Sequence, residues 1–144
     1  MAVFRRVTPD FAVAAQLTVE DIARAAVEGF ATIVNNRPEG EAGDQLTGAD
    51  AEAAARAAGL AYRALPFSPG PPPPAVLAET ADLLDAAKGP VLAYCRTGTR
   101  SVTAWAMAQA LAGTRRPEEI IALAAGAGYD LSGTRDVLDR LSPA

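Results

Sequence analysis

The chain has 144 residues, half of them hydrophobic, which is long enough for one domain with a substantial core. Its net charge of −4 at pH 7 argues against a general nucleic-acid or anionic-membrane binder. One cysteine excludes an internal disulfide, and no signal-peptide pattern or membrane-spanning apolar stretch is present, so we expect a cytoplasmic protein. The sequence contains no histidine, which removes Cys–His and Ser–His catalysis. We therefore expect no metal site and no cofactor.

Strand and helix patterns alternate along the chain and predict a single α/β domain over residues 1–144. Residues 4–15 predict one or two short strands, and Thr18 caps a helix that ends near Gly29. Further strands are expected at 31–34, 60–65 and 91–94, and further helices at 48–58, 75–88, 101–111, 117–126 and 132–141. This order implies a parallel-type central sheet flanked by helices, with ligands at the carboxyl ends of the strands.

The stretch from Tyr94 to Ser101 carries the strongest functional signal. A short apolar strand ends at Cys95, and a turn with Gly98 and two arginines leads into an apolar helix. Backbone N–H groups of such a turn and the positive end of the helix converge on one point, which suits a tetrahedral anion. The same field favours the thiolate, which is the nucleophilic form of cysteine. A purely structural thiol would leave this turn unexplained, so we expect covalent catalysis on a phosphate, thiosulfate or persulfide.

Within this loop the residues are expected to have different roles. Arg100 is the expected anion clamp, because its planar fork can hold two oxygens of a tetrahedral group. Arg96 could instead only point to solvent, and Ser101 could be an ordinary N-cap or could hydrogen-bond the sulfur. The full set of expected anion-binding loop residues is Arg96, Thr97, Gly98, Thr99 and Ser101.

Two other loops are expected to border the same cleft. Residues 35–45 follow a strand, so Arg37 could add positive charge there, and Glu39, Glu41 or Asp44 could supply a proton. For these carboxylates, a solvated loop with weak surface ion pairs is the favoured interpretation. Residues 66–74 contain six prolines and are interpreted as a stiff surface connection that could form one wall of the pocket.

The segment Tyr94-Cys95-Arg96-Thr97-Gly98-Thr99-Arg100-Ser101 resembles two families at once. Its C-x4-R length is similar to the active loop of rhodanese sulfurtransferases. Its Cys-x-x-Gly start and its Arg-Ser pair resemble the phosphate loop of protein tyrosine and dual-specificity phosphatases. That phosphatase loop is one residue longer and usually follows a histidine, whereas Tyr94 precedes Cys95 here.

Other segments resemble one bacterial family, the phosphatase-like domain of beta-lactamase hydrolase-like proteins, which is described both as a phosphatase and as a sulfur transferase. They are Gln16-Leu17-Thr18, Asn35-Asn36-Arg37-Pro38, Gly89-Pro90-Val91-Leu92-Ala93-Tyr94 and Ala127-Gly128-Tyr129-Asp130-Leu131. The resemblance implies a dual-specificity-phosphatase-like α/β fold. It also implies a functional link to a persulfide dioxygenase, since relatives occur alone or fused to such a domain.

The missing acid favours sulfur transfer over phosphate hydrolysis. Phosphatases of this fold protonate the leaving group with an aspartate on a loop that resembles residues 66–74, and this stretch has no carboxylate. Losing a general acid costs roughly 10² to 10⁴ in rate, whereas sulfite leaves thiosulfate without one. We therefore expect a sulfurtransferase that forms a Cys95 persulfide and passes sulfur to an external thiol, because the chain has no second cysteine.

Two alternatives remain open at this point. One is phosphomonoester hydrolysis through a cysteinyl-phosphate, with Asp44, Glu39 or Glu41 as the acid. The other is an inactive anion-binding sensor module that uses the same loop without covalent chemistry.

Overall fold

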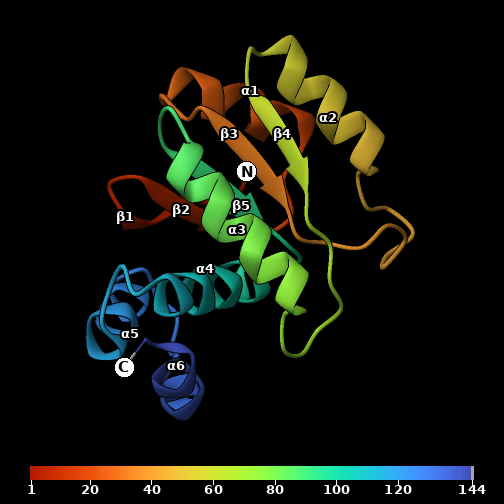
Figure 1. Ribbon diagram of the computed structural model, residues 1–144. Coiled ribbons are helices and arrows are strands. Elements are labelled where there is room, and N and C mark those ends of the chain that lie inside the picture. Colours follow the sequence, from red (N-terminus) through yellow and green to blue (C-terminus); the bar gives the residue numbers. More distant parts are fainter. Residues whose placement is uncertain (144) are drawn as a thin grey trace.

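A five-stranded sheet in the order β1-β2-β5-β3-β4 separates two apolar cores (Figure 1). The computed structural model describes residues 1–143. The strands are β1 (Arg5–Thr8), β2 (Phe11–Ala14), β3 (Thr32–Asn35), β4 (Ala61–Ala64) and β5 (Val91–Tyr94). All neighbours pair in parallel except β1 and β2, which form an antiparallel edge. The expected α/β fold with a mostly parallel sheet flanked by helices is therefore confirmed.

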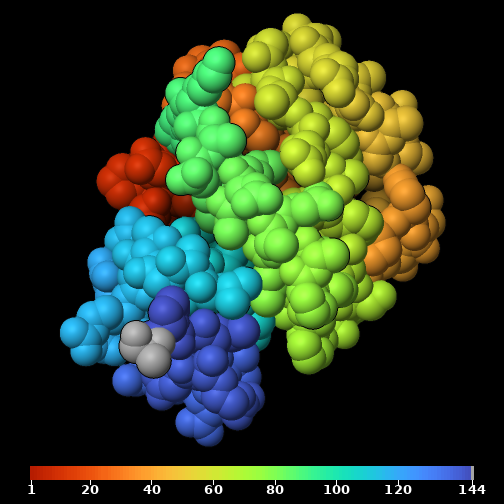
Figure 2. Space-filling model, in the orientation of Figure 1, coloured from red at the N-terminus to blue at the C-terminus, as the bar shows by residue number. Residues whose placement is uncertain are grey.

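Helices cover both faces of the sheet. They are α1 (Val19–Val27), α2 (Gly48–Ala57), α3 (Pro74–Ala86), α4 (Thr99–Ala112), α5 (Pro117–Gly126) and α6 (Arg135–Leu141), with a 3-10 turn at Ser132–Thr134. Helices α1 and α2 pack on one core, and α3 to α6 pack on the other, where α3 crosses the front of the molecule (Figure 2). Consecutive β5 side chains alternate between the cores, so Ala93 faces α4 while Tyr94 faces α1 and α2.

Local chemistry explains where the helices begin. Thr18 and Asp21 form a reciprocal capping box at the start of α1, as the sequence predicted for Thr18. Helix α4 begins at Thr99, two residues before the expected start, because Gly98 takes the N-cap position with φ of +93°. Helix α3 includes Pro74, which is tolerated in the first helical turn, and the last expected helix is split into the 3-10 turn and α6.

The register of the central strands decides where the functional loops meet. Tyr94, the last residue of β5, pairs with Ala14 at the end of β2 and with Asn35 at the end of β3. The segments that follow all three strands therefore leave the sheet at the same edge. Among residues 1–143, no helix combines the length and the apolar character needed to cross a membrane.

Candidate active site

Cys95 lies directly after β5, at the bottom of the loop that leads into α4. Its residue is 1% exposed, and its Sγ accepts a hydrogen bond from the backbone N–H of Gly98 at 3.1 Å. The backbone carbonyl of Arg96 accepts a hydrogen bond from the N–H of Gln16 at 3.3 Å, which ties the loop to the end of β2. The loop therefore curls around the sulfur and directs an amide at it.

Glycine is required at position 98 for two independent reasons. Its φ of +93° lies in the left-handed region, and a Cβ there would lie 2.2 Å from the hydroxyl oxygen of Tyr129. That hydroxyl donates a hydrogen bond to the carbonyl of Thr97 at 3.1 Å. Tyr129, which follows α5, thus closes the loop from outside and leaves room for no side chain at Gly98.

Arg100 is almost buried, and three of its N–H groups have partners. Nη1 donates to Glu41 Oε2 at 2.8 Å and to the carbonyl of Phe67 at 3.0 Å, while Nη2 donates to Glu41 Oε1 at 2.9 Å. A guanidinium has five N–H donors, so Nε–H and the second Nη2–H remain on one edge. Two parallel donors on one edge match two oxygens of a phosphate or sulfate group. These hydrogen bonds from Arg100 to Glu41, and then the nearby charge of Cys95, raise the pKa of Arg100.

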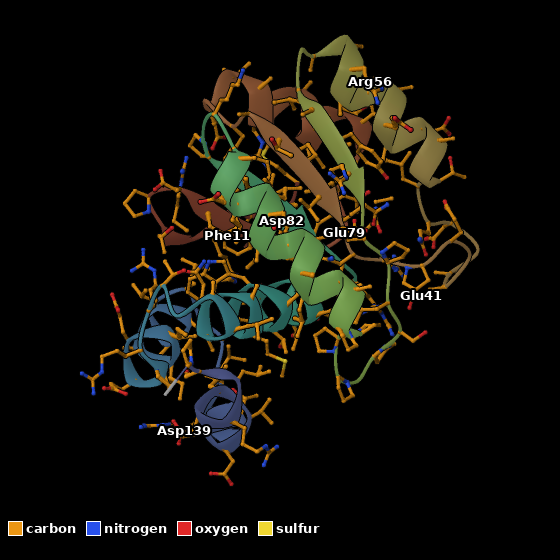
Figure 3. All side chains as sticks on the ribbon, viewed as in Figure 1. Phe11, Glu41, Arg56, Glu79, Asp82 and Asp139 are labelled. Carbon is orange, nitrogen blue, oxygen red and sulfur yellow. The ribbon has the colours of Figure 1, made fainter. Side chains whose placement is uncertain are left out.

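Glu41, labelled in Figure 3, lies in the loop after β3 and binds Arg100. The Nε of Arg37 donates to Glu41 Oε1 at 2.9 Å, and its Nη1 donates to Gln16 Oε1 at 2.9 Å. Hydrogen bonds from Arg100 and then Arg37 lower the pKa of Glu41 to about 2, so this carboxylate is ionised at neutral pH. Glu41 is exposed and forms ion pairs, as expected for this loop, but its carboxylate binds two nearly buried guanidinium groups rather than solvated surface partners.

The remaining predicted residues divide into buried and exposed groups. Ser101 is 1% exposed inside α4 and donates to Asn36 Oδ1 at 2.8 Å, so it neither caps the helix nor bonds the sulfur. Glu39 accepts from the N–H of Gly48 at the start of α2, away from Arg100. Asp44 is exposed, with no side-chain hydrogen bond or ion pair to residues 1–143. The structure thus brings Arg37 and Glu41 to the site and leaves Glu39 and Asp44 outside this network.

A cavity of about 300 Å³ lies beside the Cys95 loop. Pro69 and Gly70 form one wall, as expected for the proline-rich segment, and Thr97 and Arg100 belong to the other. Arg96 is exposed and also lines this cavity.

Sequence comparison places these features in one family. Residues 3–112 match the family model described as "Beta-lactamase hydrolase-like protein, phosphatase-like domain". A beta-lactamase hydrolase-like protein of Agrobacterium fabrum is 31% identical over 139 residues, which are 96% of this chain and 32% of that protein. The chain belongs to this family. A second relative, from Xylella fastidiosa, is 33% identical over 90% of the chain and 30% of its own length. The chain thus spans about a third of these curated relatives.

Solved structures confirm the phosphatase-like fold. A candidate phosphatase from Neisseria meningitidis superposes with a TM-score of 0.82 at 31% identity, covering 94% of this chain and 96% of that one. The active form of Tk-PTP superposes with a TM-score of 0.73 at 15% identity, covering 96% and 95% of the two chains. TpbA of Pseudomonas aeruginosa, solved with phosphotyrosine, gives 0.66 at 19% identity, over 96% and 86%. The latter two establish similarity of fold alone.

Sequence reasoning missed three groups that hold the site together. Gln16 and Tyr129 fall within segments that resemble the family, yet their polarity alone did not connect them to the Cys95 loop. The carbonyl of Phe67 leaves no side-chain signal. Glu41, a candidate acid in the sequence, lies four residues after Arg37, a spacing compatible with their ion pair but without any sign of the contact with Arg100.

Proposed function

We propose that this domain hydrolyses phosphomonoesters through a cysteinyl-phosphate on Cys95. The observation that carries the proposal is the Arg100 guanidinium at the end of the Cys95 loop, which Glu41 and Phe67 hold through three N–H groups while two others are not used by them. Membership of a phosphatase-like domain family supports hydrolysis, whereas sulfur transfer has no such support in the relatives. Phosphate chemistry therefore replaces sulfur transfer as the first candidate.

In the first step the Cys95 thiolate attacks phosphorus, and the bond from phosphorus to the leaving oxygen breaks. Loop amides and the two free donors of Arg100 stabilise the charge on the non-bridging oxygens as it develops. In the second step water attacks the cysteinyl-phosphate, inorganic phosphate leaves and the thiolate returns. The leaving oxygen takes up one proton in the first step, and the attacking water gives one up in the second.

Whether an acid can protonate the leaving oxygen determines which phosphomonoesters are hydrolysed. The segment after β4, residues 65–73, has no carboxylate, and Glu41 is ionised because its pKa is about 2. Neither region therefore donates a proton in the described state. We expect aryl phosphates with acidic leaving groups to react readily, and simple alkyl phosphates to react roughly 10² to 10⁴ times more slowly.

The test is turnover of 4-nitrophenyl phosphate together with intact-mass analysis after rapid acid quench. We expect hydrolysis by the natural chain, a transient gain of one phosphoryl group, and loss of both in Cys95→Ser. The matched control is Ser132→Ala. This change removes an exposed hydroxyl that donates a hydrogen bond to Asp130, well beyond the Cys95 loop in the sequence. Hydrolysis that survives in Cys95→Ser would exclude this mechanism.

Sulfur transfer remains a second candidate because of the loop length and the missing acid. In that reaction the Cys95 thiolate attacks the outer sulfur of thiosulfate, sulfite leaves with the bonding electron pair, and a persulfide remains on Cys95. An external thiolate then takes that sulfur, which would link the domain to a persulfide dioxygenase. Incubation with thiosulfate would add one sulfur to the natural chain and none to Cys95→Ser. Oxyanion binding without either adduct would favour a sensor module.

A further inference from the structure

The cavity beside the Cys95 loop has a chemistry that selects the leaving group of the substrate. Residues Pro69 and Gly70 lie on one side, and Arg96, Thr97, Thr99 and Thr103 lie on the other. None of its lining residues is acidic or aromatic. A pocket without aromatic side chains offers no stacking surface for a phenol ring, whereas hydroxyl groups and arginine favour a polar, negatively charged group.

Arg96 is the arginine of this cavity that has no acidic partner among residues 1–143. Arg100 shares the carboxylate of Glu41 with Arg37, whereas the Arg96 side chain is exposed and has no ion-pair or hydrogen-bond partner among the same residues. Its backbone is nevertheless fixed, since the carbonyl accepts from Gln16. Arg96 therefore holds a free guanidinium at the rim of the site, within a chain whose net charge is −4.

The first turn of α4 strengthens the positive potential of the same wall. This helix of 14 residues has no acidic residue in its first turn, so the positive end of its dipole is not offset there. The hydroxyls of Thr97 and Thr99 lie 3.1 Å apart, and Thr103 donates to the carbonyl of Thr99 at 2.7 Å. These threonines line the same cavity as Arg96, and a hydroxyl can both donate and accept hydrogen bonds.

We propose that this cavity binds a second anionic group, carried by the leaving-group portion of the substrate, and that Arg96 recognises it. The substrate class is then a phosphomonoester whose leaving group bears a carboxylate or a further phosphate. The proposal rests on the proposed function, because it assumes that the phosphoryl group occupies the Cys95 loop. A volume of about 300 Å³ accommodates a small polar group of this kind.

The test uses two non-hydrolysable ligands that differ in one charge. Propylphosphonate and 3-phosphonopropionate have similar length, and only the second has a carboxylate at the far end. Dissociation constants are measured by calorimetry at low ionic strength for the natural chain, for Arg96→Gln and for Arg56→Gln. Arg56 is a matched control, because it is an exposed arginine on α2 (Figure 3) that does not line the cavity.

We expect the natural chain and Arg56→Gln to bind 3-phosphonopropionate about tenfold more tightly than propylphosphonate. Arg96→Gln should reduce this preference to less than twofold, and the ratio of the two dissociation constants is the quantity that decides. Equal binding of both ligands by the natural chain, or a preference that survives in Arg96→Gln, would overturn the proposal. Binding of neither ligand would overturn it as well.

Failure of the proposed function gives a different result. In that case the phosphonates bind with the expected preference, but no cysteinyl-phosphate forms and 4-nitrophenyl phosphate is not hydrolysed. The recognition of two anions would then belong to another reaction at the same thiol.

Discussion

The two loops that flank the Cys95 loop both bind the guanidinium of Arg100, one through a side-chain carboxylate and the other through a backbone carbonyl. The loop between β3 and α2, residues 36–47, has four charged side chains, and its Glu41 binds Arg100 with a carboxylate. The loop between β4 and α3, residues 65–73, has no charged side chain, and it binds Arg100 with the backbone carbonyl of Phe67. The first loop thus sets the charge around Arg100, and the second sets its position and the shape of the cavity.

The two loops also hold each other in place. The N–H of Phe67 donates to the carbonyl of Asn36 at 3.2 Å, and Asn36 Nδ2 donates to the carbonyl of Leu65 at 2.9 Å. Ser101 of α4 donates to the same Asn36 side chain. A change in one loop is therefore transmitted to the other through buried hydrogen bonds, although only one loop carries charge.

The largest effect is expected when the group shared by both loops is replaced. Arg100→Lys keeps the charge but loses the planar fork, so the three hydrogen bonds and the free edge disappear together. We expect kcat/KM for 4-nitrophenyl phosphate to fall roughly 10² to 10³-fold. Steady-state kinetics measure this, with circular dichroism to check the fold. A loss below threefold would mean that Arg100 does not hold the reacting phosphate.

Removing the charge from the first loop is expected to have a smaller effect. Glu41→Gln keeps the side-chain shape but weakens the bonds that orient Arg100, so we expect kcat/KM to fall roughly tenfold. Glu39→Gln is the matched control, because the same change in the same loop affects only the cap of α2. If both variants lost activity equally, the loop would act through its overall charge rather than through contact with Arg100.

The same carboxylate predicts a dependence of stability on pH. Glu41 has a folded-state pKa of about 2, below its ordinary 4.5, so its stabilising contribution is complete above pH 4.5. That contribution is lost as the pH falls toward 2, since the unfolded chain binds the proton first. Urea unfolding at several pH values should show the natural chain losing more stability over this range than Glu41→Gln. A difference between the two that does not change with pH would contradict this.

The smallest effect is expected in the uncharged loop. Ser68 is exposed, with no side-chain hydrogen bond to residues 1–143, so Ser68→Ala should leave kcat/KM within twofold of the natural value. The same kinetic assay measures this. A larger loss would show that the second loop supplies a side chain to the reaction, and the contrast between the two loops would fail.

The order of elements and the position of Cys95 could be predicted because they depend on local patterns. Val91 to Tyr94 is a continuous apolar run, and the residues after it are polar with a glycine, so strand, loop and helix were assigned correctly. The two-residue error at the start of α4 arose because Ser101 looked like an N-cap, whereas its hydroxyl is needed by Asn36. Tertiary contacts outweighed local capping preference there.

The charge network around Arg100 could not be predicted, because it joins residues far apart in sequence. Glu41 and Arg100 are 59 positions apart, and no local pattern connects this carboxylate with that particular guanidinium. The carbonyl of Phe67 has no signature in the side-chain sequence. The parallel register of β3 and β5 supplies the missing information, since it brings the ends of both strands together.

The central place of β5 has a consequence for how the site is assembled. This strand lies between β2 and β3, which precede it by more than 50 residues, so neither can complete its pairing until residues 91–94 arrive. During synthesis, the sheet therefore stays open at its middle until residues 91–94 have been made. Because β5 joins the two parts of the sheet and leads directly into Cys95, a chain truncated before this strand has neither a continuous sheet nor a nucleophile.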